Sequence, residues 1–195
     1  MKTTKSGMND SPTKKPADDG KVYYSYADVH RTISSLAPQI QQLHAPDVIL
    51  AIGGGGFIPA RILRTVLKIP ILAVSLELYD DSTNSVRASG VKCLQWFDTA
   101  TWPGNLVNNG KVLIVDEVDD TRTTLQFCVE QVQKSKPSSI AVAVVHNKQK
   151  PKRGTLPDDV QYFAGQTVPD HWNFYPWDAI DIVQHEEKAR QCSTS

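Results

Sequence analysis

The chain has 195 residues, the size of one ordinary domain with a tail, and it is long enough to bury a core without disulfides. Lysine and arginine number 21 and aspartate and glutamate also number 21, so the net charge is zero, which argues against a general polyanion-binding role. No apolar run approaches the roughly 20 residues of a membrane span. Three unpatterned cysteines, Cys93, Cys128 and Cys192, argue against a disulfide scaffold or a zinc module and favour reduced thiols in a cytoplasmic protein.

Both ends of the chain are poor in residues that a core can bury. Residues 1–20 are mostly Lys, Asp, Ser, Thr, Pro and Gly, without the apolar stretch of a secretory signal peptide. We therefore expect a disordered tail over 1–20, one domain over 21–190 and a loose end over 191–195.

The first predicted element is an amphipathic helix that starts beside Ser25. Ser25 and Asp28 have the spacing of a capping box, in which each side chain accepts a hydrogen bond from the other residue's backbone N–H. Pro38 predicts a kink or an early break in this helix. Its apolar positions recur at intervals of four and three residues: Val29, Ile33, Leu36, Ile40 and Leu43.

Apolar segments of strand length alternate with helical patterns along the rest of the chain. The strands are DVILAIGGGG, IPILAVSLEL, KVLIVDEV and SSIAVAVVH, and the polar segment 79–90 is expected to be a long loop. Pro59 is predicted to open the helix after the first strand. The apolar faces of the two helices are Ile62, Leu63, Val66 and Leu67, and Leu125, Cys128, Val129 and Val132. This alternation predicts an α/β fold with a doubly wound, mostly parallel sheet flanked by helices.

Four successive glycines, residues 53–56, follow the first of these strands. Glycine lets the backbone turn and approach a ligand closely, and the N-terminus of the next helix offers N–H groups to an anion. The alternative is a tight turn that requires small residues, but four glycines at a strand end favour anion binding. The spacing fits neither a dinucleotide-binding motif nor a Walker A loop.

The segment VLIVDEVDDTRTTL, residues 112–125, places acids and threonines at the end of another apolar strand. Its four acids, Asp116, Glu117, Asp119 and Asp120, repel one another unless a cation or hydroxyl groups share the site. The threonines begin a helix whose N–H groups can hold a phosphate. Ligands of parallel sheets bind at the carboxyl ends of the strands, so we expect sugar hydroxyls, a divalent metal and a phosphate here.

These residues resemble the 5-phosphoribosyl 1-diphosphate (PRPP) motif of type I phosphoribosyltransferases. The segment GGGGFIPARIL is similar to the family's pyrophosphate loop and its helix. HNKQKPK and VPDHWNFYPWD are similar to the purine-binding parts of the 6-oxopurine branch, and DEVDDTRTT resembles fungal hypoxanthine-guanine and xanthine phosphoribosyltransferases. The resemblance covers about residues 22–190, and it implies a small hood built largely from 146–180.

The resemblance also implies a role for each matching residue. Asp116 and Glu117 would bind the ribose hydroxyls directly or through Mg²⁺, and Asp120 would face purine N7 as general base or acid. The 5′-phosphate would be held by Asp120, Thr121, Arg122, Thr123 and Thr124, and pyrophosphate by Gly54 and Gly55.

On the purine side, Lys148 would donate to O6 and Trp172 would stack on the ring. Asn173 would accept from the base through its carbonyl. Asp178 would contact metal-bound pyrophosphate or lie near purine position 2, which makes the implied metal set Asp116, Glu117 and Asp178. From the residues alone, Lys148 is equally a solvated lysine and Trp172 a core residue, so only their place in the motifs assigns them a ligand.

Two further features bear on the site. Most members of the wider family have glycine where this chain has Arg122, and a non-glycine residue there must accept the backbone conformation of the loop. Its side chain would reach a phosphate or cover the site. The loop 79–90 is where the family keeps a mobile lid, and Arg87 or Lys92 would neutralise pyrophosphate from it.

The sequence therefore predicts Mg²⁺-dependent transfer of ribose 5-phosphate from PRPP to N9 of a 6-oxopurine, as a purine-salvage enzyme and homodimer. It does not distinguish hypoxanthine, guanine and xanthine. The alternative is a regulator that keeps this fold, senses nucleotides and binds RNA or DNA. Lys148, Trp172 and the neutral net charge favour the enzyme, which would bind neither nucleic acid nor membrane.

Overall fold

The computed structural model describes residues 13–77, 79–80, 85–86 and 90–192. Its centre is a six-stranded sheet of order β6-β3-β2-β7-β8-β9. The strands are β2 (Val48–Gly53), β3 (Ile71–Glu77), β6 (Lys92–Gln95), β7 (Lys111–Asp119), β8 (Ser139–Lys148) and β9 (Gln161–Val168). All neighbours in this sheet are parallel except β6, which joins β3 in the antiparallel direction at one edge. The predicted α/β fold with a mostly parallel sheet is confirmed.

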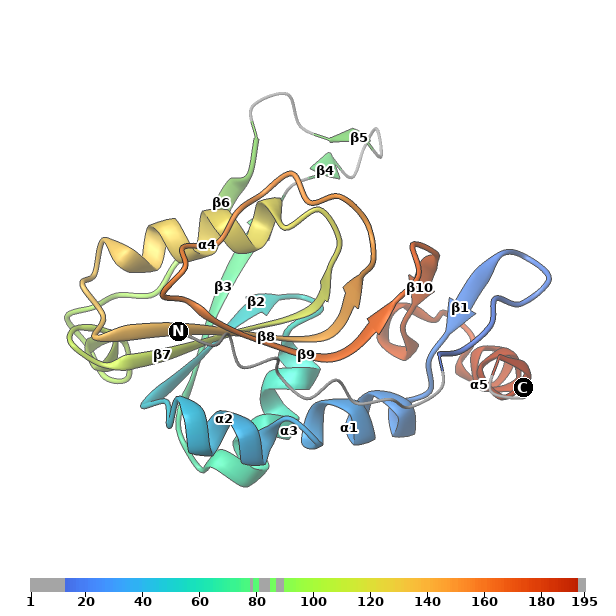
Figure 1. Ribbon diagram of the computed structural model, residues 1–195, viewed down its shortest axis with the longest axis horizontal. Coiled ribbons are helices and arrows are strands. Elements are labelled where there is room, and N and C mark those ends of the chain that lie inside the picture. Colours follow the sequence, from blue (N-terminus) through green and yellow to red (C-terminus); the bar gives the residue numbers. More distant parts are fainter. Residues whose placement is uncertain (1–12, 78, 81–84, 87–89, 193–195) are drawn as a thin grey trace, which may run out of the picture.

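Side chains that alternate along each strand divide the core into two layers (Figure 1). On one face, Ile49 and Ala51 of β2 pack with α1 (Tyr26–Ser34), α2 (Ala37–Leu43) and α3 (Phe57–Leu67). On the other, Val48 and Leu50 pack with α4 (Thr123–Gln133). All four of these β2 side chains are fully buried, so helices cover both faces of this strand. Their burial stabilises the position of the strand and of the loop at its carboxyl end.

The first helix follows its capping and proline signals, but Leu43, which we placed on its apolar face, is 59% exposed. The capping box between Ser25 and Asp28 is present, and Pro38 stands in the first turn of α2, after the helical segment breaks at Ser34. Proline has no N–H to donate to the preceding turn, so it is accepted at the start of a new helix rather than inside one. The predicted early break is confirmed.

The prediction for the helix after the glycines is wrong in two details. The helix α3 begins at Phe57 after the cap residue Gly56, so Pro59 lies within its first turn instead of opening it. Val66 is 53% exposed, although we placed it on the apolar face. The buried stripe instead follows Ala60, Leu63 and Leu67, at spacings of three and four.

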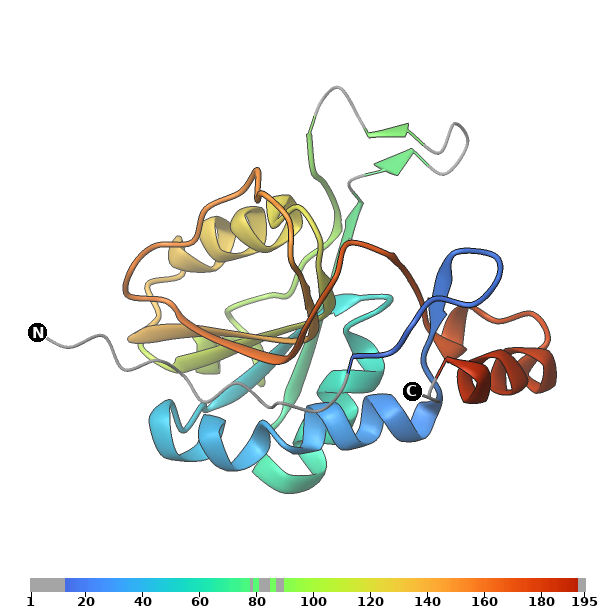
Figure 2. The ribbon, with the colours of Figure 1, turned by 45° about the vertical axis from the view of Figure 1, so that its right-hand side comes forward.

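A smaller unit stands at one side of the sheet (Figure 2). In it, β1 (Lys21–Tyr23) pairs in parallel with β10 (Trp172–Phe174), next to a short 3-10 helix η2 (Pro176–Asp178) and α5 (Ile182–Gln191). The hood predicted from 146–180 corresponds only in part to this unit, because 161–168 forms β9 of the main sheet. The amino-terminal β1 and the carboxyl-terminal α5 supply the rest.

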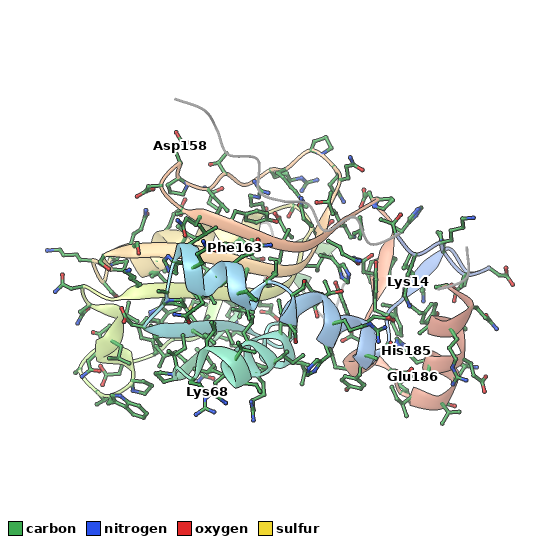
Figure 3. All side chains as sticks on the ribbon, turned by 60° about the horizontal axis from the view of Figure 1, so that its bottom comes forward. Lys14, Lys68, Asp158, Phe163, His185 and Glu186 are labelled. Carbon is green, nitrogen blue, oxygen red and sulfur yellow. The ribbon has the colours of Figure 1, made fainter. Side chains whose placement is uncertain are left out.

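Residues on both sides of the predicted domain pack against this unit. The Lys14 ammonium donates to the carbonyls of Tyr23 and Ala189 at 3.1 and 2.9 Å and pairs with Asp28 at 2.6 Å. Figure 3 shows Lys14 and His185 at the same end of the molecule. Residues 13–20 are therefore part of the packed structure and not a loose tail, and Cys192 is likewise buried. The expectation for 1–12 and 193–195 falls outside the described residues.

The expected lid loop 79–90 lies largely outside the described residues, Arg87 included. Its described parts are β4 (Tyr79–Asp80) and β5 (Ser85–Val86), which pair in the antiparallel direction. A second 3-10 helix, η1 (Gly104–Val107), precedes β7. No helix in the described part of the chain is long and apolar enough to cross a membrane.

Candidate functional site

The glycine run and the acidic segment meet at the carboxyl ends of neighbouring strands. Strands β2 and β7 pair with Ala51 opposite Val115, so the loops that follow them are adjacent. Between them lies a cavity of about 260 Å³, lined by Ile52, Gly53–Gly55, Leu76 and residues 116–125. The position matches the expected place of a ligand in a parallel sheet.

The glycines in this cavity serve two different needs. A β-carbon at Gly55 would lie 2.1 Å from Cδ of Glu117, and one at Gly56 would lie 2.4 Å from the carbonyl oxygen of Val115. A β-carbon at Gly56 would meet fixed backbone, whereas one at Gly55 would have to displace the Glu117 carboxyl that Trp177 holds. A β-carbon at Gly54 would meet nothing within 4 Å, so its surroundings are open to a ligand. The tight-turn explanation accounts for Gly55 and Gly56, and close ligand approach remains the explanation for Gly54.

Substitution of Gly55 by alanine should destabilise the protein. We expect Gly55→Ala to lower the free energy of unfolding by about 1–3 kcal/mol, because the added methyl group must displace the Glu117 carboxyl. Gly54→Ala is the matched control and should change stability by less than about 0.5 kcal/mol. Urea unfolding of both variants measures the difference, and equal stabilities would contradict the packing argument.

Asp116 and Glu117 place two carboxylates at the carboxyl end of β7. One Asp116 oxygen accepts the Glu117 backbone N–H at 2.8 Å, and Glu117 Oε2 accepts the Trp177 indole N–H at 2.8 Å. Burial, together with the neighbouring Glu117 charge, raises the pKa of Asp116 well above its usual value. Burial likewise raises the pKa of Glu117 to about 7. Such a pair is stabilised when a cation or hydroxyl donors enter the cavity.

The raised pKa of Glu117 makes stability depend on pH. Between the usual value of 4.5 and about 7 the folded chain holds a proton that the unfolded chain releases, so stability should fall as pH rises. Glu117 alone should contribute a loss of about 3 kcal/mol at most between about pH 5 and 7.5. Glu117→Gln should remove this contribution, while the raised pKa of Asp116 and the lowered pKa of His146 add slopes of opposite sign to each other in both proteins. Urea unfolding of both proteins across this pH range measures the difference. If the free energy of unfolding changes equally with pH in wild type and in Glu117→Gln, the assignment to Glu117 is refuted.

Asp119 also lines the cavity, but its side chain is bound by neighbouring residues of the protein. Its side chain is fully buried, and Oδ2 accepts from Nε and Nη2 of Arg122 at 2.9 and 2.7 Å. The same oxygen accepts from the Tyr162 hydroxyl at 2.8 Å. The Arg122 side chain is thus bound to Asp119, and its role toward the 5′-phosphate stays a prediction.

Asp120 is paired with lysines at the end of the adjacent strand. Its Oδ1 lies 2.9 Å from Nζ of Lys150 and 3.3 Å from Nζ of Lys148. Lys150 also bonds Asp170 at 3.0 Å. Burial alone would raise the pKa of Asp120, but the two ammonium groups outweigh it and hold that pKa below its usual value. At neutral pH the carboxylate is therefore ionised and can accept a proton.

Lys152 is a site residue that sequence analysis missed. Its ammonium donates to the carbonyls of Asp119, Asp120 and Lys148 at 2.6, 2.9 and 2.9 Å. We placed HNKQKPK among the purine-binding segments and gave Lys152 no role of its own. The sequence did offer one indication of this role. Lysines recur at every second position from Lys148 to Lys152, at the end of the strand that follows the acidic segment. Trp177, the partner of Glu117, was also missed because it lies 60 residues away along the chain.

The threonine segment forms an uncapped helix start at the cavity. Helix α4 begins at Thr123, and its cap residue Arg122 makes no side-chain capping hydrogen bond. The first N–H groups of a helix have no partner within it, so an anion can accept from them. The hydroxyl oxygens of Thr121 and Thr123 lie 3.1 Å apart. Thr121–Thr124 all line the cavity, as the sequence predicted.

The predicted purine residues come from other elements. Lys148 ends β8 beside Asp120, whereas Trp172 and Asn173 lie in β10, with Trp172 62% exposed. Asp178 lines a second cavity with Tyr23, His185 and Lys188. Its charge nevertheless contributes to the raised pKa of Glu117, so the two carboxylates are near one another. Trp172, Asn173 and Asp178 are not among the residues that line the first cavity.

Among the described residues, no group of three or more His, Cys, Asp or Glu side chains is arranged to hold a metal ion. Mg²⁺ is usually bound through one or two carboxylates together with substrate phosphates and water. Asp116 and Glu117 are buried acids that form no ion pair with the described residues, and they have the oxygen chemistry for this kind of site.

Comparisons with known proteins agree with this geometry. Hypoxanthine-guanine phosphoribosyltransferase of Schizosaccharomyces pombe is 42% identical, with 87% of this chain and 94% of that protein covered. Xanthine phosphoribosyltransferase 1 of Saccharomyces cerevisiae is 42% identical, with 89% and 97% covered.

Solved structures share the fold. A Neisseria gonorrhoeae protein with bound ppGpp has a TM-score of 0.78 at 42% identity, with 93% of this chain and 99% of that chain covered. Purine phosphoribosyltransferase from Pyrococcus horikoshii has a TM-score of 0.62 at 26% identity, with 83% and 96% covered. Residues 23–179 match the family described as phosphoribosyl transferase domain. Together with the fungal relatives, this match shows that the chain belongs to the phosphoribosyltransferase family.

Proposed function

We propose that this protein transfers ribose 5-phosphate from PRPP to N9 of a 6-oxopurine and releases pyrophosphate. One observation carries the proposal. A single cavity joins two buried carboxylates, an uncapped helix N-terminus and the open glycine Gly54, and Asp120 at its edge meets Lys148. PRPP presents vicinal hydroxyls, a 5′-phosphate and a pyrophosphate, and the cavity offers one kind of partner for each.

Each part of PRPP has its own partners in this proposal. Asp116 and Glu117 accept from the ribose hydroxyls in their ionised form, which a bound cation would favour against their raised pKa values. The backbone N–H groups and hydroxyls of Thr121–Thr124 hold the 5′-phosphate. The backbone around Gly54 and Gly55 faces pyrophosphate. Bound Mg²⁺ would be held by Asp116 and Glu117 and would supply positive charge that stabilises the departing pyrophosphate.

Asp120 and Lys148 act on the purine. Lys148 donates to O6, and the ionised Asp120 accepts the proton that the base gives up at N7. In the transfer, the bond from C1′ to the pyrophosphate oxygen breaks and the bond from N9 to C1′ forms. The exposed Trp172 supplies a ring face for stacking, and Asn173 and Asp178 lie in the same unit for contacts near purine position 2. A cytoplasmic homodimer stays a prediction.

The alternative is a nucleotide-sensing regulator that binds RNA or DNA. Its expected feature is a free basic face, and the basic segment of this chain is already engaged. The side chains of Lys148, Lys150 and Lys152 are only 12%, 26% and 14% exposed, and each pairs with an acid or with carbonyls of the acidic segment. This arrangement favours the enzyme.

An assay with three bases tests the proposal. The protein is incubated with PRPP and Mg²⁺, and hypoxanthine, guanine and xanthine are offered separately while nucleotide formation is followed. We expect turnover of at least one base, and the ranking of the three identifies the salvage reaction. Absence of turnover, with nucleotide binding still measurable by calorimetry, would overturn the enzyme and leave the regulator.

The relative that holds ppGpp suggests a second ligand for the same cavity. ppGpp combines a guanine ring with phosphate groups on both sides of the ribose, so it presents the groups that the loops and the hood would bind. We expect ppGpp to raise the apparent KM for PRPP without changing kcat. An inhibition pattern that is unaffected by PRPP concentration would contradict a shared site.

A further inference from the structure

The loop that would hold the 5′-phosphate contains a non-glycine residue in the left-handed region. Arg122 has φ of 67°, a conformation that costs an ordinary residue roughly 1–2 kcal/mol. The residue also precedes helix α4 without capping it through its side chain. Its presence at this position therefore calls for compensating contacts by the side chain.

Those contacts form a compact cluster behind the loop. The Arg122 guanidinium makes two hydrogen bonds to one oxygen of the buried Asp119, and its Cζ lies 5.0 Å from the centroid of the Tyr162 ring. The Tyr162 hydroxyl donates to the same Asp119 oxygen, and the Lys152 ammonium lies 3.5 Å from the other. We call Asp119, Arg122 and Tyr162 the clamp. It joins the end of β7, the start of α4 and strand β9.

The loop is also held from its backbone side. The N–H groups of Arg153 and Gly154 both donate to the Thr121 carbonyl at 3.0 Å. Gly154 packs so closely that a β-carbon there would lie 2.5 Å from the Arg122 carbonyl oxygen. These contacts hold the Thr121 and Arg122 carbonyls, so the N–H groups that follow them in the chain start from a fixed backbone.

We propose that Arg122 is a positioning residue: with Asp119 and Tyr162 it holds the 5′-phosphate loop in its binding conformation before PRPP arrives. The inference rests on the proposed function and assigns the arginine a role behind the loop instead of in contact with phosphate. A loop that is already ordered loses less conformational freedom on binding, which strengthens the binding of the group it holds. The clamp should therefore act on PRPP and not on the purine.

Arg122→Gly removes the side chain while glycine accepts the same φ. If the loop then spends about a tenth of its time in the binding conformation, the KM for PRPP rises about tenfold. The KM for the purine and kcat should stay within about twofold of wild type. In this proposal the clamp orders the loop before PRPP binds, and the loop holds PRPP and not the purine. Tyr162→Phe removes one of the three hydrogen bonds to Asp119 Oδ2 and should give a smaller increase.

Arg64→Ala is the matched control, because it removes one positive charge from an exposed residue of α3, away from the loop and its supports. It should leave the KM for PRPP within about twofold, since an exposed charge is screened. If Arg122→Gly fails to fold because Asp119 loses its partner, Asp119→Asn/Arg122→Gly removes the buried charge and should show the same rise. A folded variant of either kind with a KM for PRPP near the wild-type value would overturn the proposal, as would an equal rise in the KM for the purine.

Ribose 5-phosphate binding, measured by calorimetry, separates this test from that of the proposed function. Wild type should bind it about tenfold more tightly than Arg122→Gly, whether or not the protein turns over any base. Lack of turnover together with this difference in affinity would overturn the proposed transferase activity and support the positioning role of Arg122. Equal affinities, or no binding by wild type, would overturn the clamp.

Discussion

Asp120→Asn is expected to lower kcat by about 10²–10⁴-fold, the usual contribution of a positioned general base. Asparagine keeps the shape of the side chain but cannot accept the purine proton as a carboxylate does. Its carbonyl oxygen still accepts from Lys148 and Lys150, so the variant should fold. Because Asp120 would act on the purine, calorimetry should show PRPP affinity within a few-fold of wild type.

Asp170→Asn is the control for this substitution. Asp170 is an exposed carboxylate that bonds the same Lys150 ammonium at 3.0 Å and lies 3.7 Å from that of Lys148. Both variants therefore remove one negative charge from the same two lysines. Only Asp120→Asn should abolish turnover. Similar losses in the two variants would show that the lysine environment, and not proton transfer to Asp120, limits the reaction.

Sequence patterns predicted the parts of the site that are local. The apolar strand 112–115 and the glycines after 52 both end at the same edge of the sheet, because parallel strands deliver their carboxyl ends together. The family resemblance then assigned chemistry to these loops, and the family and the fold are confirmed. The individual ligand roles of the site residues stay predictions.

What the sequence did not reveal are contacts between distant segments. The four acids in residues 116–120 look equivalent in the sequence, and all of them line the cavity. Asp119, however, is bonded to Arg122 and Tyr162, whereas Asp116 accepts the backbone N–H of Glu117. Their difference depends on which side of β7 each residue faces and on what the later strands place there. Tyr162 lies 43 residues from Asp119, and no local periodicity encodes such a pairing.

Lys152→Met tests how strongly these distant segments depend on one another. The Lys152 ammonium is the donor shared by three carbonyls, two in the acidic segment and one at the end of β8. Burial lowers the pKa of Lys152 below its usual value, as expected for an ammonium held among acceptors away from water. Methionine has a comparable length but donates nothing, so the carbonyls lose their partner.

We expect Lys152→Met to lower the free energy of unfolding by about 3 kcal/mol, since unsatisfied partly buried acceptors cost about 1–3 kcal/mol each and some relax toward water. It should also raise the KM for both PRPP and the purine, because Lys152 joins the loop of Asp120 to the strand end that carries Lys148. This double effect distinguishes it from Arg122→Gly, which should affect PRPP alone. Lys134→Met, at the exposed C-cap position after α4, controls for the loss of charge and should change neither stability nor KM appreciably. Urea unfolding and steady-state kinetics compare the two variants. If Lys152→Met behaves like Lys134→Met, the sheet itself, and not this ammonium, holds the loop of Asp120 against the strand end that carries Lys148.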